Sequence, residues 1–129
     1  ALYGMAARSE EIANAICDAA EVFRAPLLGM AGTKHEEVYK KRGFSFLAEF
    51  YVDLDYDGDG RLIITREHEA WDPDVAAKRT VRAITEKKVR TVDGNDIPMI
   101  ADCICVHSDT PGAVAVAKAV KEAIKPFLN

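Results

Sequence analysis

The chain has 129 residues, of which 49% are hydrophobic and 29% charged, and its net charge is −4. This length suits one domain with a hydrophobic core. The composition excludes a basic nucleic-acid-binding surface, because no basic stretch is interleaved with aromatic residues, and a membrane span, because no apolar run approaches the necessary length. The three cysteines are too few and too scattered for a disulfide framework, which favours reduced thiols and a cytoplasmic location.

Strand-like and helix-like patterns alternate along the chain. In the first half we expect a helix capped by Ser9, a strand over 26–30, a helix from Thr33 to near Gly43, a strand over 44–52 and a loop over 53–60. In the second half we expect a short strand over 61–65, a helix capped by Asp72, a hairpin of strands 89–92 and 97–100, a strand over 100–106 and a final helix over 110–125. This alternation predicts an α/β fold with a parallel sheet and covering helices.

Local signals support these elements. The first helix has apolar residues at helical spacing: Ile12, Ile16, Ala19 and Phe23. Thr33 and Glu36 have the spacing of a capping box, and 93–96 (Asp-Gly-Asn-Asp) is typical of a hairpin turn. Thr110 can cap the final helix, with Pro111 in its first turn.

A histidine and a carboxylate follow the last predicted strand. His107 ends the apolar run, and Asp109 stands just before the final helix. Ligands bind at the carboxyl ends of parallel strands, so we predict that both side chains face a cleft there. His107 is the best candidate for acid–base chemistry because imidazole titrates near neutral pH. Asp109 has three open roles, namely to orient His107, to bind substrate or to help cap the helix.

Two further carboxylates, Glu49 and Asp53, lie on or just past a predicted strand end. A spacing of four places them on the same side of an extended strand. A carboxylate pair beside a cleft can polarise water or hold a substrate ammonium. Rim charges without a function are the alternative.

Metal sites are not expected. The loop from Asp55 has the acids and the glycine of an EF-hand, but Arg66 stands at the twelfth position, where calcium needs a bidentate glutamate. Tight calcium binding is therefore not predicted. Cys103 and Cys105 form a weak metal signal, and buried thiols are the default. We interpret His35 and His68 as surface residues, so the histidines form no zinc site.

The segment 105–113 reads Cys-Val-His-Ser-Asp-Thr-Pro-Gly-Ala and resembles the C-terminal signature of the LamB/YcsF family, which has glycine where Ser108 stands. The first residues, Ala-Leu-Tyr-Gly, resemble the end of that family's Lys-Pro-His-Gly-Ala-Leu-Tyr-Asn motif. The family's middle motif is matched by Glu49, Asp53, Tyr56, Asp59, Gly60, Leu62 and Arg66, with Leu54 where arginine is usual. Residues 91–94 (Thr-Val-Asp-Gly) and 97–98 (Ile-Pro) also resemble the family's sequence pattern.

The resemblance implies the C-terminal half of an irregular (β/α) barrel of the glycoside hydrolase/deacetylase type, with residues 1–129 as a single-domain fragment. Since such a barrel needs roughly 200 residues or more, we expect the fragment alone to be inactive and to expose apolar surface that an upstream half would cover. The chain starts within a motif, and by resemblance about half of the family's length lies upstream.

The resemblance also implies a function, the ATP-dependent hydrolysis of the lactam 5-oxoproline to glutamate, as the A subunit of 5-oxoprolinase with partner subunits B and C. No Gly-x-x-x-x-Gly-Lys loop occurs, so ATP handling is expected upstream or in the partners. His107, Asp109, Glu49 and Asp53 are the candidate catalytic residues, and Tyr3 and Thr110 the candidate substrate-binding residues. A metal-dependent deacetylase or deamidase and a non-catalytic module that binds small carboxylates remain as alternatives.

Overall fold

The computed structural model describes residues 2–67 and 69–128, which form an α/β fold with parallel strands. The chain divides into two compact units, Ala1–Glu49 and Phe50–Asn129, and each is described by itself. The prediction that residues 1–129 form a single domain stays a prediction.

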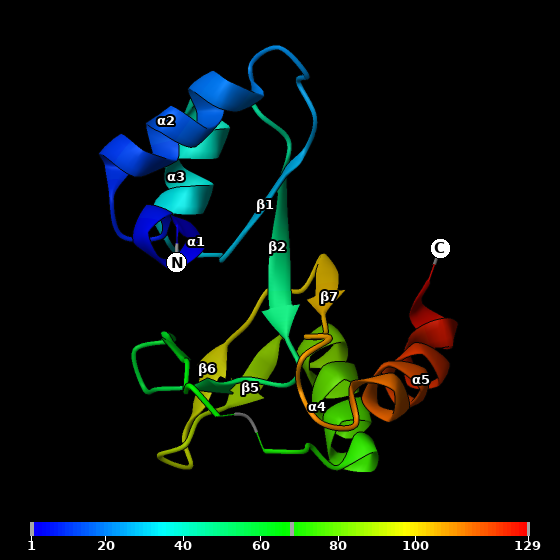
Figure 1. The fold of residues 1–129 in the computed structure, drawn as a ribbon. Coiled ribbons are helices and arrows are strands. Elements are labelled where there is room, and N and C mark those ends of the chain that lie inside the picture. Colours follow the sequence, from blue (N-terminus) through cyan, green and yellow to red (C-terminus); the bar gives the residue numbers. More distant parts are fainter. Residues whose placement is uncertain (1, 68, 129) are drawn as a thin grey trace. The chain divides into compact units, whose positions relative to one another are not determined.

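The described residues of the first unit form α1 (Leu2–Ala6), α2 (Glu10–Ala20), β1 (Leu27–Gly29), α3 (Lys34–Lys41) and the first part of β2 (Phe46–Tyr51). β1 and β2 are parallel, with Leu27 opposite Phe46 and Gly29 opposite Ala48. Helices α2 and α3 lie side by side (Figure 1). Their contact forms a core of Ala13, Cys17, Val38, Tyr39 and Phe44.

The caps of this unit explain where its helices begin. Ser9 accepts a hydrogen bond from the Ile12 N–H, which confirms the first predicted cap. Thr33 caps α3 by accepting a hydrogen bond from the His35 N–H, and Glu36 accepts one from the Gly32 N–H. The predicted capping box would use the N–H groups of Glu36 and Thr33, so each donor lies one residue earlier than predicted. The prediction that Phe23 lies on the buried face of α2 is wrong, because the helix ends at Ala20 and Phe23 is 80% exposed.

Gly29 is required by a close approach between β1 and α3. A Cβ atom at this position would lie 2.6 Å from the His35 Cβ. We expect Gly29→Ala to lower the free energy of unfolding by about 1–3 kcal/mol, because the packed core must shift to admit the methyl group. The matched control is Gly4→Ala in α1, where the new methyl meets nothing within 4 Å. Chemical denaturation of both variants measures the difference, and equal stability would contradict this steric account.

The second unit holds the end of β2 and the remaining elements. In chain order these are β3 (Asp55–Tyr56), β4 (Leu62–Ile63), α4 (Pro73–Thr85), β5 (Lys88–Arg90), β6 (Asp96–Pro98), β7 (Cys103–Cys105), α5 (Ala113–Ile124) and the 3₁₀ helix η1 (Lys125–Phe127). Helices α4 and α5 pack against each other (Figure 1). Asp72 caps α4 through the N–H groups of Asp74 and Val75, as predicted.

The hairpin is confirmed, with β5 antiparallel to β6 and Gly94 in the left-handed conformation at φ 79°. Two details differ from expectation. The predicted loop over 53–60 contains β3, which pairs antiparallel with β4. The last strand is shorter than the apolar run 100–106, since only Cys103–Cys105 are in β7.

Candidate active site

Two predicted site residues meet in the second unit, beyond the ends of β2 and β7. Asp53 follows β2, and His107 follows β7. The Val52 N–H donates to the Cys105 carbonyl over 3.3 Å, which holds the two segments together. Asp53 and His107 are 54 positions apart in sequence, so this pairing is a product of the tertiary fold.

The Asp53 carboxylate binds His107 at two points. Its Oδ2 accepts the backbone N–H of His107 at 2.6 Å, and its Oδ1 lies 2.8 Å from the ring Nδ1. An ionised carboxylate has only acceptors, so Nδ1 must carry the proton that this hydrogen bond shares. In the neutral imidazole the lone pair then resides on Nε2. The geometry therefore gives His107 the tautomer of a general base.

The environment of the pair keeps one end fixed and the other accessible. The Asp53 side chain is only 1% exposed, whereas 33% of the His107 side chain is exposed. The Tyr51 ring stacks on the imidazole with 5.9 Å between centroids. Nε2 makes no hydrogen bond to another residue in the described ranges 2–67 and 69–128. It can therefore accept a proton from a bound water or substrate.

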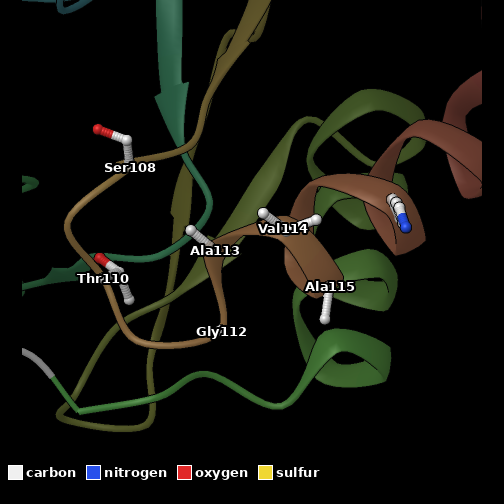
Figure 2. A pocket seen from close by; sticks show the side chains of 7 residues that line it. Ser108, Thr110, Gly112, Ala113, Val114 and Ala115 are labelled. Atoms are coloured by element: carbon white, nitrogen blue, oxygen red, sulfur yellow. The ribbon is translucent and has the colours of Figure 1, made fainter.

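Of the roles left open for Asp109, the orienting one is filled by Asp53. Asp109 is exposed, in the loop between β7 and α5. An open hollow of about 550 Å³ adjoins this loop and is lined by Ser108, Thr110, Gly112, Ala113, Val114, Ala115 and Lys118. Figure 2 shows Ser108 and Thr110 on the loop and Ala113 to Ala115 on the first turn of α5. Neither His107 nor Asp109 lines this hollow, so their predicted position at a shared cleft stays a prediction.

The prediction that Thr110 caps the final helix is wrong. The N-cap is Gly112, whose left-handed φ of 78° separates Thr110 from the helical path, and α5 begins at Ala113. Thr110 is instead buried, with 4% exposure. Its hydroxyl has no hydrogen-bond partner within the described part of the chain. A buried hydroxyl in this position is a free polar group beside the hollow.

The remaining candidates, Tyr3 and Glu49, contact each other in the first unit. The Tyr3 hydroxyl donates to Glu49 Oε2 over 2.8 Å. Glu49 lies within β2, but β2 ends at Tyr51, so strand alternation does not extend to Asp53. Glu49 and Asp53 also belong to different units. The argument that placed both carboxylates on one side of a strand therefore fails.

His35 was predicted at the surface and is completely buried. Its Nδ1 accepts the Met30 N–H at 3.1 Å, so Nε2 carries the proton and donates to the Tyr3 carbonyl at 3.1 Å. The ring also stacks on Tyr39, with centroids 5.4 Å apart. A sequence signal existed, since positions 35, 38 and 39 share one helical face and all are buried. His35 thus holds α3 against the segment after β1 and the first helix.

Burial lowers the pKa of the His35 imidazole below its ordinary value of 6.5, and the hydrogen bond to the Tyr3 carbonyl only partly offsets this. The unfolded chain therefore binds the proton first as the pH falls. We expect the free energy of unfolding to decrease from about pH 7 to pH 5 for this reason. In His35→Gln that pH dependence should shrink, while His107→Asn should retain it. Denaturation at several pH values measures this, and an unchanged slope in His35→Gln would contradict it.

The acidic loop is occupied by its own hydrogen bonds. Asp57 Oδ1 accepts the N–H groups of Asp59 and Arg61, and Asp59 pairs with Arg61.

In the described ranges, no three His, Cys, Asp or Glu side chains form a metal-binding group. His68 lies outside these ranges. Cys17 is buried, and Cys103 and Cys105 are half-buried. No helix among the described residues is long and apolar enough to cross a membrane.

Comparisons with known proteins agree on one family. The model of the LamB/YcsF family matches residues 1–127. The chain is 40% identical over 126 residues to a 5-oxoprolinase A subunit (number 2) of Pseudomonas syringae pv. tomato, covering 96% of this chain and 50% of that protein. It is 36% identical over 130 residues to the lactam utilization protein lamB of Emericella nidulans, covering 98% and 51%.

A solved structure is also similar. The lactam utilization protein from Thermus thermophilus superposes with a TM-score of 0.84 at 35% identity, over 98% of this chain and 51% of that one. The chain thus spans about half the length of these relatives. The family match over nearly the whole chain shows that this protein belongs to the LamB/YcsF family.

Proposed function

We propose that these residues are part of an enzyme that hydrolyses the lactam 5-oxoproline to glutamate in an ATP-dependent reaction, as the A subunit of a cytoplasmic 5-oxoprolinase. The relatives' names support this substrate. The observation that carries the proposal is the Asp53–His107 pair, in which a buried carboxylate holds Nδ1 of an imidazole whose side chain is 33% exposed. Such a group is what the hydrolysis of a ring amide requires.

The chemistry explains the need for both a base and ATP. The carbonyl of an unstrained amide is stabilised by resonance, and its nitrogen leaves poorly. Transfer of the γ-phosphoryl group of ATP to the amide oxygen makes the ring carbon electrophilic. His107 Nε2 takes a proton from the attacking water and returns it to the ring nitrogen as the C–N bond breaks. The resulting acyl phosphate reacts with a second water, which yields glutamate and phosphate.

Other residues have proposed roles in binding. Glu49, whose Oε2 accepts the Tyr3 hydroxyl, stays a candidate for binding a substrate ammonium, and Tyr3 stays a candidate for substrate binding. Thr110 and the N-terminus of α5 line the hollow, where the helix dipole would favour the substrate carboxylate. Asp109 stays a candidate for substrate binding. The phosphoryl transfer itself is assigned to the upstream half or to partner subunits B and C.

We also propose that the upstream half completes a (β/α) barrel. Parallel strands are normally covered on both faces. In the first unit, Leu28 and Leu47 face each other across β1 and β2 and remain 46% and 38% exposed. An upstream segment that covers this face would remove both leucines from water. Residues 1–129 alone should accordingly be inactive.

The test is turnover by the complete protein with its partner subunits. We expect ADP, phosphate and glutamate to form together from 5-oxoproline and ATP, and residues 1–129 to give no turnover in the same assay. ATP consumption without glutamate, or lactam hydrolysis by the 129-residue chain alone, would count against the proposal.

The same geometry favours a second candidate, a metal-dependent deacetylase or deamidase. Histidines that bind a metal often donate their other ring nitrogen to a carboxylate, as His107 does to Asp53. Metal analysis of the purified complete protein separates the two candidates. A stoichiometric divalent metal whose removal abolishes activity would favour the deacetylase type.

A further inference from the structure

Arg79 donates hydrogen bonds to the backbone on both sides of Asp53. This residue lies on α4, and its Nη1 donates to the Val52 carbonyl over 3.1 Å while its Nη2 donates to the Leu54 carbonyl over 2.7 Å. The two carbonyls belong to the residues immediately before and after Asp53. One planar guanidinium therefore fixes the peptide groups that determine where the Asp53 side chain points.

The Arg79 guanidinium lies close to three aromatic rings. It lies over the rings of Trp71, Phe50 and Tyr56, at 4.7, 5.6 and 5.5 Å from their centroids. No carboxylate forms an ion pair with Arg79 among the residues that the structure describes. Burial lowers the pKa of the guanidinium, and attraction to Tyr56, Asp55 and Asp53 opposes this effect. Arg79 is half-buried, and two backbone carbonyls and three aromatic rings hold its guanidinium in one position.

From these contacts we infer that Arg79 is a positioning residue for the Asp53–His107 pair. Arg79 holds the 52–54 backbone, this backbone aims the Asp53 carboxylate, and the carboxylate selects the Nδ1–H tautomer of His107. The consequence for turnover rests on the proposed function, whereas the consequence for the tautomer does not. A residue that only stabilised the loop would leave the His107 tautomer unchanged in any variant that still folds.

The experiment is nitrogen NMR of the complete protein labelled with ¹⁵N-histidine, in which long-range couplings to the ring protons show which nitrogen is protonated. Arg79→Gln removes both the positive charge and the planar guanidinium that donates to two carbonyls. Arg79→Lys keeps the charge but not the planar guanidinium. The matched control is Arg82→Gln, three positions further along α4, because the side-chain hydrogen bonds of Arg82 go to Asp96 and Glu86 and, among the described residues, none goes to 52–54. His35 is an internal reference with the opposite tautomer.

We expect the His107 signal of Arg79→Gln to move from the Nδ1–H tautomer toward a mixture with Nε2–H, with a smaller change in Arg79→Lys and none in Arg82→Gln. In the active assembly, kcat should fall about 10-fold or more in Arg79→Gln with a smaller change in KM. The inference is overturned if both Arg79 variants fold with an unchanged His107 tautomer. If Arg79→Gln does not fold, an unchanged tautomer in Arg79→Lys overturns it.

The outcomes separate this inference from the proposed function. A shifted tautomer in a protein that does not turn over 5-oxoproline would support the role of Arg79 and refute the function. Normal turnover of the wild-type assembly, together with an unchanged His107 tautomer in the folded Arg79 variants, would support the function and refute the role of Arg79.

Discussion

Replacing His107 with asparagine is expected to lower the rate of 5-oxoproline hydrolysis by about 10²-fold or more in the complete assembly. Asparagine retains a polar group of similar reach but has no basic nitrogen to take a proton from water. The exposed position of His107 predicts that the fold survives. Glutamate formation under saturating ATP and lactam measures the effect.

The unfolding midpoint of His107→Asn serves as its control, since a normal midpoint assigns the lost rate to chemistry. Undiminished glutamate formation by a folded His107→Asn assembly would remove His107 from the mechanism. The Asp53 carboxylate would then have a structural role, and the proposed base would have to be another residue.

Asp53→Asn is expected to lower turnover by up to about 10⁴-fold, the loss seen when a catalytic-triad histidine loses its orienting carboxylate. The variant amide can present its NH₂ group to Nδ1, which forces the proton onto Nε2 and leaves no base there. The amide oxygen can still accept the backbone N–H of His107, but this hydrogen bond loses the charge of the carboxylate, so some loss of stability is expected as well.

The matched control is Asp55→Asn, an exposed carboxylate two positions further along the same segment. It should lose little activity, because it is not part of the pair. Equal losses in Asp53→Asn and Asp55→Asn would show that the segment tolerates no change in charge, and would contradict a specific role for the Asp53 carboxylate.

Local structure could be predicted where a local signal decides it. Ser9 and Asp72 each have a side-chain oxygen that reaches the first N–H groups of a helix, and Gly94 accepts the left-handed turn of the hairpin. Thr110 carries the same capping signal as Ser9. It fails as a cap because Gly112 turns the chain between Thr110 and α5.

The sequence identified Asp53 and His107 as candidate site residues but did not predict that they contact each other. Both residues were candidates, yet the orienting role was open to Asp109, which is the nearer carboxylate in sequence. The hydrogen bond joins residues 54 positions apart, and no local pattern encodes that distance. His35 shows the converse, because its polar neighbours suggested exposure while tertiary packing against Tyr3 of α1 buried it.

Two departures from the family pattern lie next to this site. Leu54 stands where arginine is usual, and its side chain is buried with 6% exposure. Ser108 stands where glycine is usual, and it lines the hollow beside α5. A hydroxyl in place of a hydrogen adds a hydrogen-bonding group to the lining of the hollow.

The most direct test of the central claim is the protonation site of His107 in the wild-type complete protein. Nitrogen NMR of the neutral imidazole should show the His107 proton on Nδ1, and Asp53→Asn should move that proton to Nε2. His35 should show the Nε2–H form in both proteins. A wild-type His107 that carries its proton on Nε2 would contradict the account, because the exposed nitrogen would then have no lone pair with which to act as a base.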